Sequence, residues 1–130
     1  MTIQSPHLPQ PATATRDSIE TTIRLISSKE DDPFAILSGS DDLTFMQTLL
    51  TPHGFSLEYQ EGSLEAHYET VRSDLSAQEI IEAFSNYADG NTTWRHRFDF
   101  RRLEVGSAYY RMGYVLGSIV GHVARLFARR

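Results

Sequence analysis

The chain has 130 residues, of which 40% are hydrophobic and 22% are charged, and it contains no cysteine. These values predict one globular domain, and they exclude disulfide bonds and any thiolate ligand or nucleophile. The formal net charge is −5, but residues 30–89 carry thirteen carboxylates and one arginine, a net charge of −12, whereas residues 95–130 carry eight arginines and two carboxylates, a net charge of +6. Such segregation can steer an oppositely charged partner, so it predicts recognition rather than chemistry.

The first fifteen residues contain three of the five prolines of the chain. They lack the basic and apolar regions of a secretory signal, and the missing cysteines suit a reducing compartment. We therefore predict a disordered tail at residues 1–15 and a cytoplasmic location.

The next segment, residues 17–28, fits a helix or a strand. Three isoleucines recur at helical spacing after a residue that can cap a helix, Asp17 or Ser18. The β-branched run at residues 21–23 also allows a strand. Both readings stay open, and the helix is favoured.

Strand patterns dominate the middle of the chain. Residues 33–39 form a short apolar run between turn formers, which is typical of a buried strand. Apolar and polar residues then alternate in residues 43–49 and 55–59, and Pro52 and Gly54 occupy turn positions between them. This pattern predicts a β-hairpin, and renewed alternation at residues 66–70 predicts a third antiparallel strand.

A second helix is predicted after Ser76. Ser76 and Glu79 have the spacing of a capping box, and Gly90 stands where a helix commonly ends. The buried stripe is formed by Ile80, Ile81, Phe84 and Tyr87. Residues 92–102 then alternate aromatic with largely basic side chains, which predicts a strand. Arginine beside aromatic residues can bind nucleic acid, but the net charge and the acidic middle argue against that partner.

Residues 106–130 predict an amphipathic helix with no acidic residue. A basic face stands opposite an apolar face, and a third strip carries Gly113, Gly117 and Gly121, which invites close packing of another backbone. The apolar stretch is shorter than the roughly 20 residues needed to span a bilayer. Docking on the sheet is favoured, and pairing with another helix or lying on an anionic membrane surface remain alternatives.

These elements together predict an α+β fold, with an antiparallel β-meander of about five strands and helices packed on one face. The domain would extend over residues 16–105. The amphipathic C-terminal helix, residues 106–130, would dock on this domain or on a partner.

Catalytic chemistry has one candidate, because His67 and Glu69 share a strand face and Glu58 can lie across from them. The outward face of a meander is normally solvated, however, and the sequence contains no metal-binding spacing, nucleophile elbow or phosphate-binding loop. We predict no enzyme activity, no catalytic residue, no metal site and no cofactor.

The stretch TFMQTLLTPHGFSLEYQEGSLEAHYETV, followed by SAQEIIEAFSNYADGNTTW, resembles small bacterial immunity proteins of polymorphic toxin systems. The likeness covers residues 33 to 94 and lies in the order of elements and in the texture FMQT, LEYQEG, HYET, FSNYADG, W. It implies a cytoplasmic, non-enzymatic protein that binds and blocks a cognate toxin. The C-terminal glycine-bearing helix is not part of this pattern.

The leading hypothesis is an immunity-type inhibitor that binds a basic protein partner through an acidic surface. The predicted contact residues are Asp41, Asp42, Glu58, Glu61, Glu65 and Glu69. The alternative is a small oligomeric or membrane-peripheral adaptor organised by the glycines of the C-terminal helix. A third hypothesis is an enzyme that uses His67 with Glu58 or Glu69.

Overall fold

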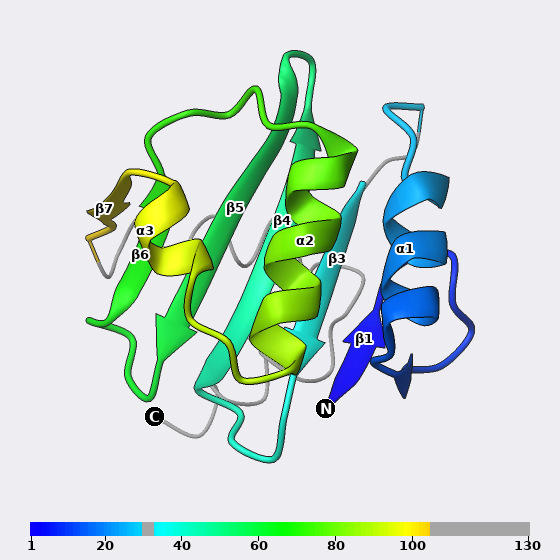
Figure 1. The fold of residues 1–130 in the computed structure, drawn as a ribbon, viewed down its shortest axis with the longest axis horizontal. Coiled ribbons are helices and arrows are strands. Elements are labelled where there is room, and N and C mark those ends of the chain that lie inside the picture. Colours follow the sequence, from blue (N-terminus) through cyan, green and yellow to red (C-terminus); the bar gives the residue numbers. More distant parts are fainter. Residues whose placement is uncertain (30–32, 105–130) are drawn as a thin grey trace.

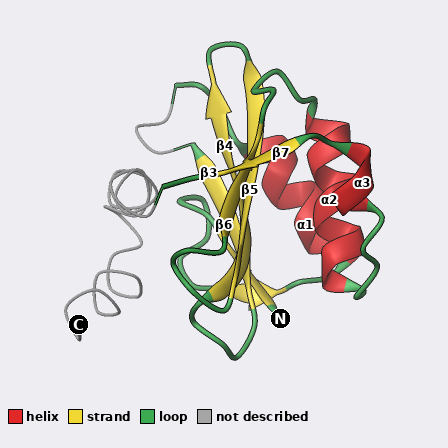
Figure 2. Ribbon diagram, turned by 90° about the vertical axis from the view of Figure 1, so that its left-hand side faces the viewer, coloured by secondary structure: helices red, strands yellow, loops and turns green. Residues whose placement is uncertain are grey.

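The computed structural model describes residues 1–29 and 33–104, and its strands form one antiparallel sheet of seven strands in the order β2-β1-β3-β4-β5-β6-β7 (Figure 1). The three helices of the described residues, α1 to α3, cover one side of this sheet (Figure 2). We call that side the helix face and the opposite side the outer face. In chain order the elements are β1 (Thr2–Gln4), β2 (Ala12–Thr13), α1 (Arg16–Leu25), β3 (Phe34–Ser38), β4 (Thr44–Thr51), β5 (Gly54–Glu61), β6 (His67–Thr70), α2 (Ala77–Ala88), α3 (Trp94–Arg97) and β7 (Phe100–Arg102).

The predicted α+β class, with helices packed against an antiparallel sheet, is confirmed. The sheet has seven strands rather than about five because the N-terminal residues add β1 and β2. Strands β3 to β6 follow one another as a meander, so their order in the sheet matches their order in the sequence. The hydrophobic core lies between this sheet and the helices, around side chains such as Leu57 and Phe84 that are fully buried.

The predicted disordered tail, residues 1–15, is wrong. Strand β1 pairs with β3, and Ile3 opposite Leu37 is fully buried in the core. The prolines fall between β1 and β2, where a turn closes with a 3.0 Å hydrogen bond from the Leu8 amide to the Ser5 carbonyl. The prolines therefore indicate the turn between two short strands, and the flanking residues are ordered by pairing and burial.

Residues 16–25 resolve the helix-or-strand ambiguity in favour of a helix, α1, but the cap is neither Asp17 nor Ser18. Thr15 is the N-cap: its hydroxyl accepts from the Ser18 amide at 3.0 Å, and the Ser18 hydroxyl accepts from the Thr15 amide at 2.8 Å. This reciprocal pair satisfies two amides at the start of the helix, and the isoleucine stripe then packs into the core.

The predicted hairpin is confirmed as β4 and β5, which pair along their whole length from Thr44 opposite Glu61 to Thr51 opposite Gly54. Gly54 has φ of 140°, and a Cβ there would come within 2.9 Å of the Asp74 backbone, so this turn requires glycine. The third strand is confirmed as β6. Helix α2 begins with the predicted capping box of Ser76 and Glu79.

The strand predicted at residues 92–102 is wrong over its first half. Residues 94–97 form the single turn α3, and only residues 100–102 form a strand, β7. Trp94 and Phe98 are four residues apart, so one helical turn can bury both side chains in the core, where the Trp94 ring lies 4.8 Å from the Tyr59 ring. Packing therefore decides the conformation, although the sequence alternates as a strand does.

The predicted C-terminal helix, residues 106–130, with Gly113, Gly117 and Gly121, lies outside the described residues. Over residues 1–29 and 33–104, no helix has the length and apolar character needed to cross a membrane.

Candidate functional site

Two acidic turns lie side by side at one end of the sheet, the lower end in Figure 1. The β3–β4 turn and the β5–β6 turn meet at the carbonyl of Leu43. This carbonyl accepts a 3.1 Å hydrogen bond from the Gly62 amide and a 3.0 Å bond from Nε2 of Gln60. We call this region the acidic end and define it by four of the predicted contact residues: Asp41, Asp42, Glu61 and Glu65.

The carboxylates of the acidic end are accessible. Asp41, Glu61 and Glu65 are exposed, and Asp42 is half-buried. The Leu43 amide at 2.9 Å and the Thr44 hydroxyl at 2.7 Å donate to the Asp41 carboxylate, and these bonds lower its pKa. Asp41 is therefore charged at neutral pH, and the hydrogen bonds fix its direction.

Aromatic side chains border the acidic end. Burial raises the pKa of Tyr87, and the nearby charges of Glu61 and Asp41 raise it further. Arg95 forms an ion pair with Glu61, and its guanidinium lies over the rings of Tyr59, at 5.4 Å, and Trp94, at 4.8 Å. Tyr59 and Trp94 are buried, so of these three rings the half-buried Tyr87 is the one that a partner can reach. Its helical spacing predicted only a place in the buried stripe of α2.

Glu58 and Glu69 do not belong to this surface, and their prediction as exposed contact residues is wrong. They are 1% and 4% exposed. Both lie on the outer face as paired residues of β5 and β6. Glu69 accepts a 2.9 Å bond from Nε of Arg101 on β7. The prediction of a solvated outer face fails for the same reason.

Glu58 instead belongs to a buried polar network with His67 and Gln60. Oε1 of Glu58 lies 2.9 Å from Nε2 of His67, and Oε1 of Gln60 lies 3.0 Å from Nδ1. Since Nε2 of Gln60 donates to the Leu43 carbonyl, its Oε1 must accept, and Nδ1 of His67 must carry a hydrogen. One proton then lies between His67 and Glu58. This arrangement satisfies the imidazole on both sides and holds it rigidly.

The structure brings His67, Glu58 and Glu69 onto one face, as the enzyme hypothesis requires. His67 is fully buried and already bonded at both nitrogens, which leaves it no position for a substrate proton. Across the described part of the chain, no group of three or more His, Cys, Asp or Glu residues is arranged to hold a metal ion. The geometry therefore favours a structural role for the network.

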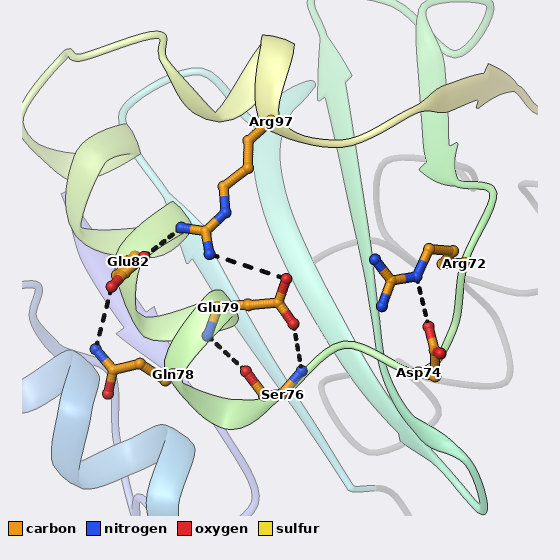
Figure 3. Close-up of polar contacts among 7 residues, drawn as sticks. All are labelled: Arg72, Asp74, Ser76, Gln78, Glu79, Glu82 and Arg97. Atoms are coloured by element: carbon orange, nitrogen blue, oxygen red, sulfur yellow. Dashed lines mark hydrogen bonds and ion pairs between the residues drawn. The ribbon is translucent and has the colours of Figure 1, made fainter.

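Within the described residues, three of the four arginines of the basic segment, Arg95, Arg97 and Arg101, pair with carboxylates of the acidic segment. Arg97 on α3 bridges Glu79 and Glu82 on α2, and Arg72 pairs with Asp74 at 2.8 Å (Figure 3). Further pairs join Arg95 to Glu61 and Arg101 to Glu69. The prediction of two separate charged regions thus fails for much of the domain, because α3 and β7 pack beside the acidic elements. Within the predicted contact set, the accessible carboxylates are those of the acidic end, where Glu61 is paired with Arg95.

A small cleft of about 110 Å³ lies at the opposite end of β6. It is lined by Thr70, Val71, Arg72, Leu75, Arg97, Phe98 and Asp99. Both of its arginines are bound to carboxylates, as Figure 3 shows, so the cleft presents no unpaired cation to an anionic ligand. Trp94 and Phe98 are also buried, which removes them as stacking platforms for bases.

Comparison with known proteins yields no relative, since no family model, no curated protein and no solved structure matches the chain significantly. The resemblance to immunity proteins therefore stays a prediction.

Proposed function

We propose that this protein is a non-enzymatic, cytoplasmic protein-binding module of the immunity type, which inhibits a basic partner protein through its acidic end. One observation carries the proposal: the Leu43 carbonyl ties two acidic turns together, so that four carboxylates from distant parts of the sequence form one surface. Of the six predicted contact residues, this surface contains four: Asp41, Asp42, Glu61 and Glu65.

The acidic end has the physical properties of a recognition surface. Its carboxylates are mounted on short turns with internal hydrogen bonds, such as those of Asp41, so that less conformational entropy is lost when a partner binds. Clustered charge of one sign accelerates encounter with a basic partner. The half-buried Tyr87 beside it can provide the desolvated contact on which affinity commonly depends.

The partner that fits this chemistry is a protein with a basic cleft, such as a toxin that acts on nucleic acid. Such a cleft binds phosphates through lysine and arginine. A rigid set of carboxylates can bind the same lysine and arginine side chains in place of the phosphates, and so block the cleft.

The test pairs Glu65→Lys with Asp99→Lys and measures, by calorimetry, the affinity for the product of any toxin-like reading frame that neighbours this gene. Both residues are exposed and both changes add two positive charges, but Asp99 lies at the opposite end of β6. We expect Glu65→Lys to weaken binding at least about tenfold, because like charges meet at the interface, and Asp99→Lys to change it little. Binding by the unaltered protein should also weaken as salt increases. Equal effects of the two variants, or no neighbouring toxin that binds, would refute the proposal.

A further inference from the structure

The outer face of the sheet is buried, although all three described helices lie on the helix face (Figure 2). Phe34 and Ile36 on β3 and Phe45 on β4 are at most 6% exposed. Strand pairing sets these side chains opposite in direction to core residues such as Leu37, since neighbours along a strand point to opposite faces. Pairing between strands covers their edges but leaves both faces of the sheet open. Burial of the outer face therefore requires a second layer.

We propose that this second layer is residues 105–130 of the same chain, docked across the outer face. This inference goes beyond the proposed function, because the acidic end lies on the turns at one end of the sheet and not on its outer face.

The place where the described chain ends supports this occupant. Leu103 directly follows β7, and its amide donates a 2.9 Å bond to the carbonyl of His67 on β6. The chain therefore leaves the sheet beside the polar network. The remaining 26 residues would measure about 39 Å as a helix. Strands β3 to β6 span only about 14 Å, so the segment is long enough to cross them.

The chemistry of the segment also matches the outer face. Residues 105–130 contain four arginines, one histidine and no carboxylate, and their predicted apolar stripe includes Leu116, Ile119 and Phe127. The outer face combines apolar side chains on β3 and β4 with the carboxylates of Glu58 and Glu69, which are paired residues on β5 and β6. An acid-free amphipathic segment can cover the first group with its apolar side chains and meet the second with positive charge.

Gln47 gives an independent observation at the centre of the same face. It is 1% exposed, it pairs with Ile36 on one side and Glu58 on the other, and neither atom of its amide has a hydrogen-bond partner. Buried amides are normally bonded. A polar group reaching this face from a covering layer would satisfy it.

The test uses nuclear Overhauser effects between methyl and aromatic protons in the full-length chain. Ile36 and Ile3 form a matched pair, because they lie on the adjacent strands β3 and β1 but on opposite faces. We expect the Ile36 methyl group to show contacts with side chains of residues 105–130, and the Ile3 methyl group to show none. A second sample, mixed from labelled and unlabelled chains, separates contacts within a chain from contacts between chains.

Two results would overturn the inference. If contacts from Ile36 to residues 105–130 appear only between chains, a second copy covers the face. If no such contact appears in a chain whose Ile3 signals show the folded core, the segment does not dock there. Contacts within one chain support the inference. Their absence would not affect the charge-reversal test at Glu65, which tests the proposed function separately.

Discussion

The two faces of the sheet are buried to a similar degree but by different chemistry. On the helix face, Leu37, Met46 and Leu57 are completely buried and apolar. On the outer face, Glu58 and His67 are equally buried but polar, and they are held by a hydrogen-bond network. The comparison shows that one strand, β5, can serve two kinds of interior. One is stabilised by removing apolar surface from water, and in the other the cost of burying polar groups such as Glu58 and His67 is offset by their hydrogen bonds.

The largest effect is expected on the helix face. Phe84 is completely buried between α2 and the sheet, so Phe84→Ala should reduce the free energy of unfolding by about 3–5 kcal/mol. Urea denaturation measures this loss. Leu25→Ala is the control, because Leu25 is 54% exposed at the end of α1 and its replacement should cost less than about 0.5 kcal/mol. A small loss for Phe84→Ala would mean that this face is not tightly packed.

The outer face should respond to the loss of a partner rather than to the loss of volume. Glu58→Leu or His67→Leu alone leaves the other polar group buried without its bond, and each should cost about 3 kcal/mol. The double replacement removes both polar groups and should cost clearly less than the sum of the single changes. Urea denaturation of the four proteins gives this coupling energy. Additive losses would contradict the shared proton between the two side chains.

Features of the fold that depend on local signals could be predicted from the sequence. Pro52 and Gly54 specify the hairpin turn, and Ser76 with Glu79 specifies the start of α2, because each signal acts within four residues. Within the predicted contact set, the acidic turns were identified as turns from their composition. Their meeting at the Leu43 carbonyl depends on strand register and could not be read from the sequence.

The outer face could not be predicted for a physical reason. Glu58, His67 and Glu69 alternate with apolar neighbours in the same way on a solvated face and on a covered one. Only tertiary packing decides between these cases. The pairing of Arg95 with Glu61 is equally invisible in the sequence, because it joins residues 34 positions apart. Trp94 shows the same limit, since core packing overrides a strand-like pattern.

Two glutamines on the outer face sharpen the comparison further. Gln60 holds His67 in position, so Gln60→Met should cost at least about 1 kcal/mol by leaving Nδ1 of His67 without an acceptor. No described residue bonds the Gln47 amide, so Gln47→Met loses at most a bond that the covering layer supplies and should cost less than Gln60→Met. The two changes are chemically identical and both sites are 1% exposed. Thermal denaturation should therefore separate them, and equal losses would show that burial alone, not bonding, sets stability on this face.

The smallest effect is expected at the exposed ion pairs, which contrast with the buried pair of Glu58 and His67. The Arg97 guanidinium lowers the pKa of Glu82 from its ordinary value of 4.5, chiefly through their hydrogen bond. Because the folded-state pKa is the lower one, the pair stabilises the fold above pH 4.5 and loses this contribution as the pH falls through the folded-state value. Arg97→Gln should raise the pKa of Glu82 toward 4.5, as followed by carboxyl carbon shifts in NMR titrations.

Arg72→Gln is the matched control for that titration. The Arg72 guanidinium lowers the pKa of Asp74 in the same way, so this change should raise the pKa of Asp74 and leave Glu82 unchanged. Since both pairs are accessible to water, neither replacement should lower stability at neutral pH as much as a single change in the buried pair. If Arg97→Gln proved as destabilising as His67→Leu, the distinction between the buried network and the surface pairs would be lost. The fold would then depend on its bridges across α2 and α3 as much as on its interior.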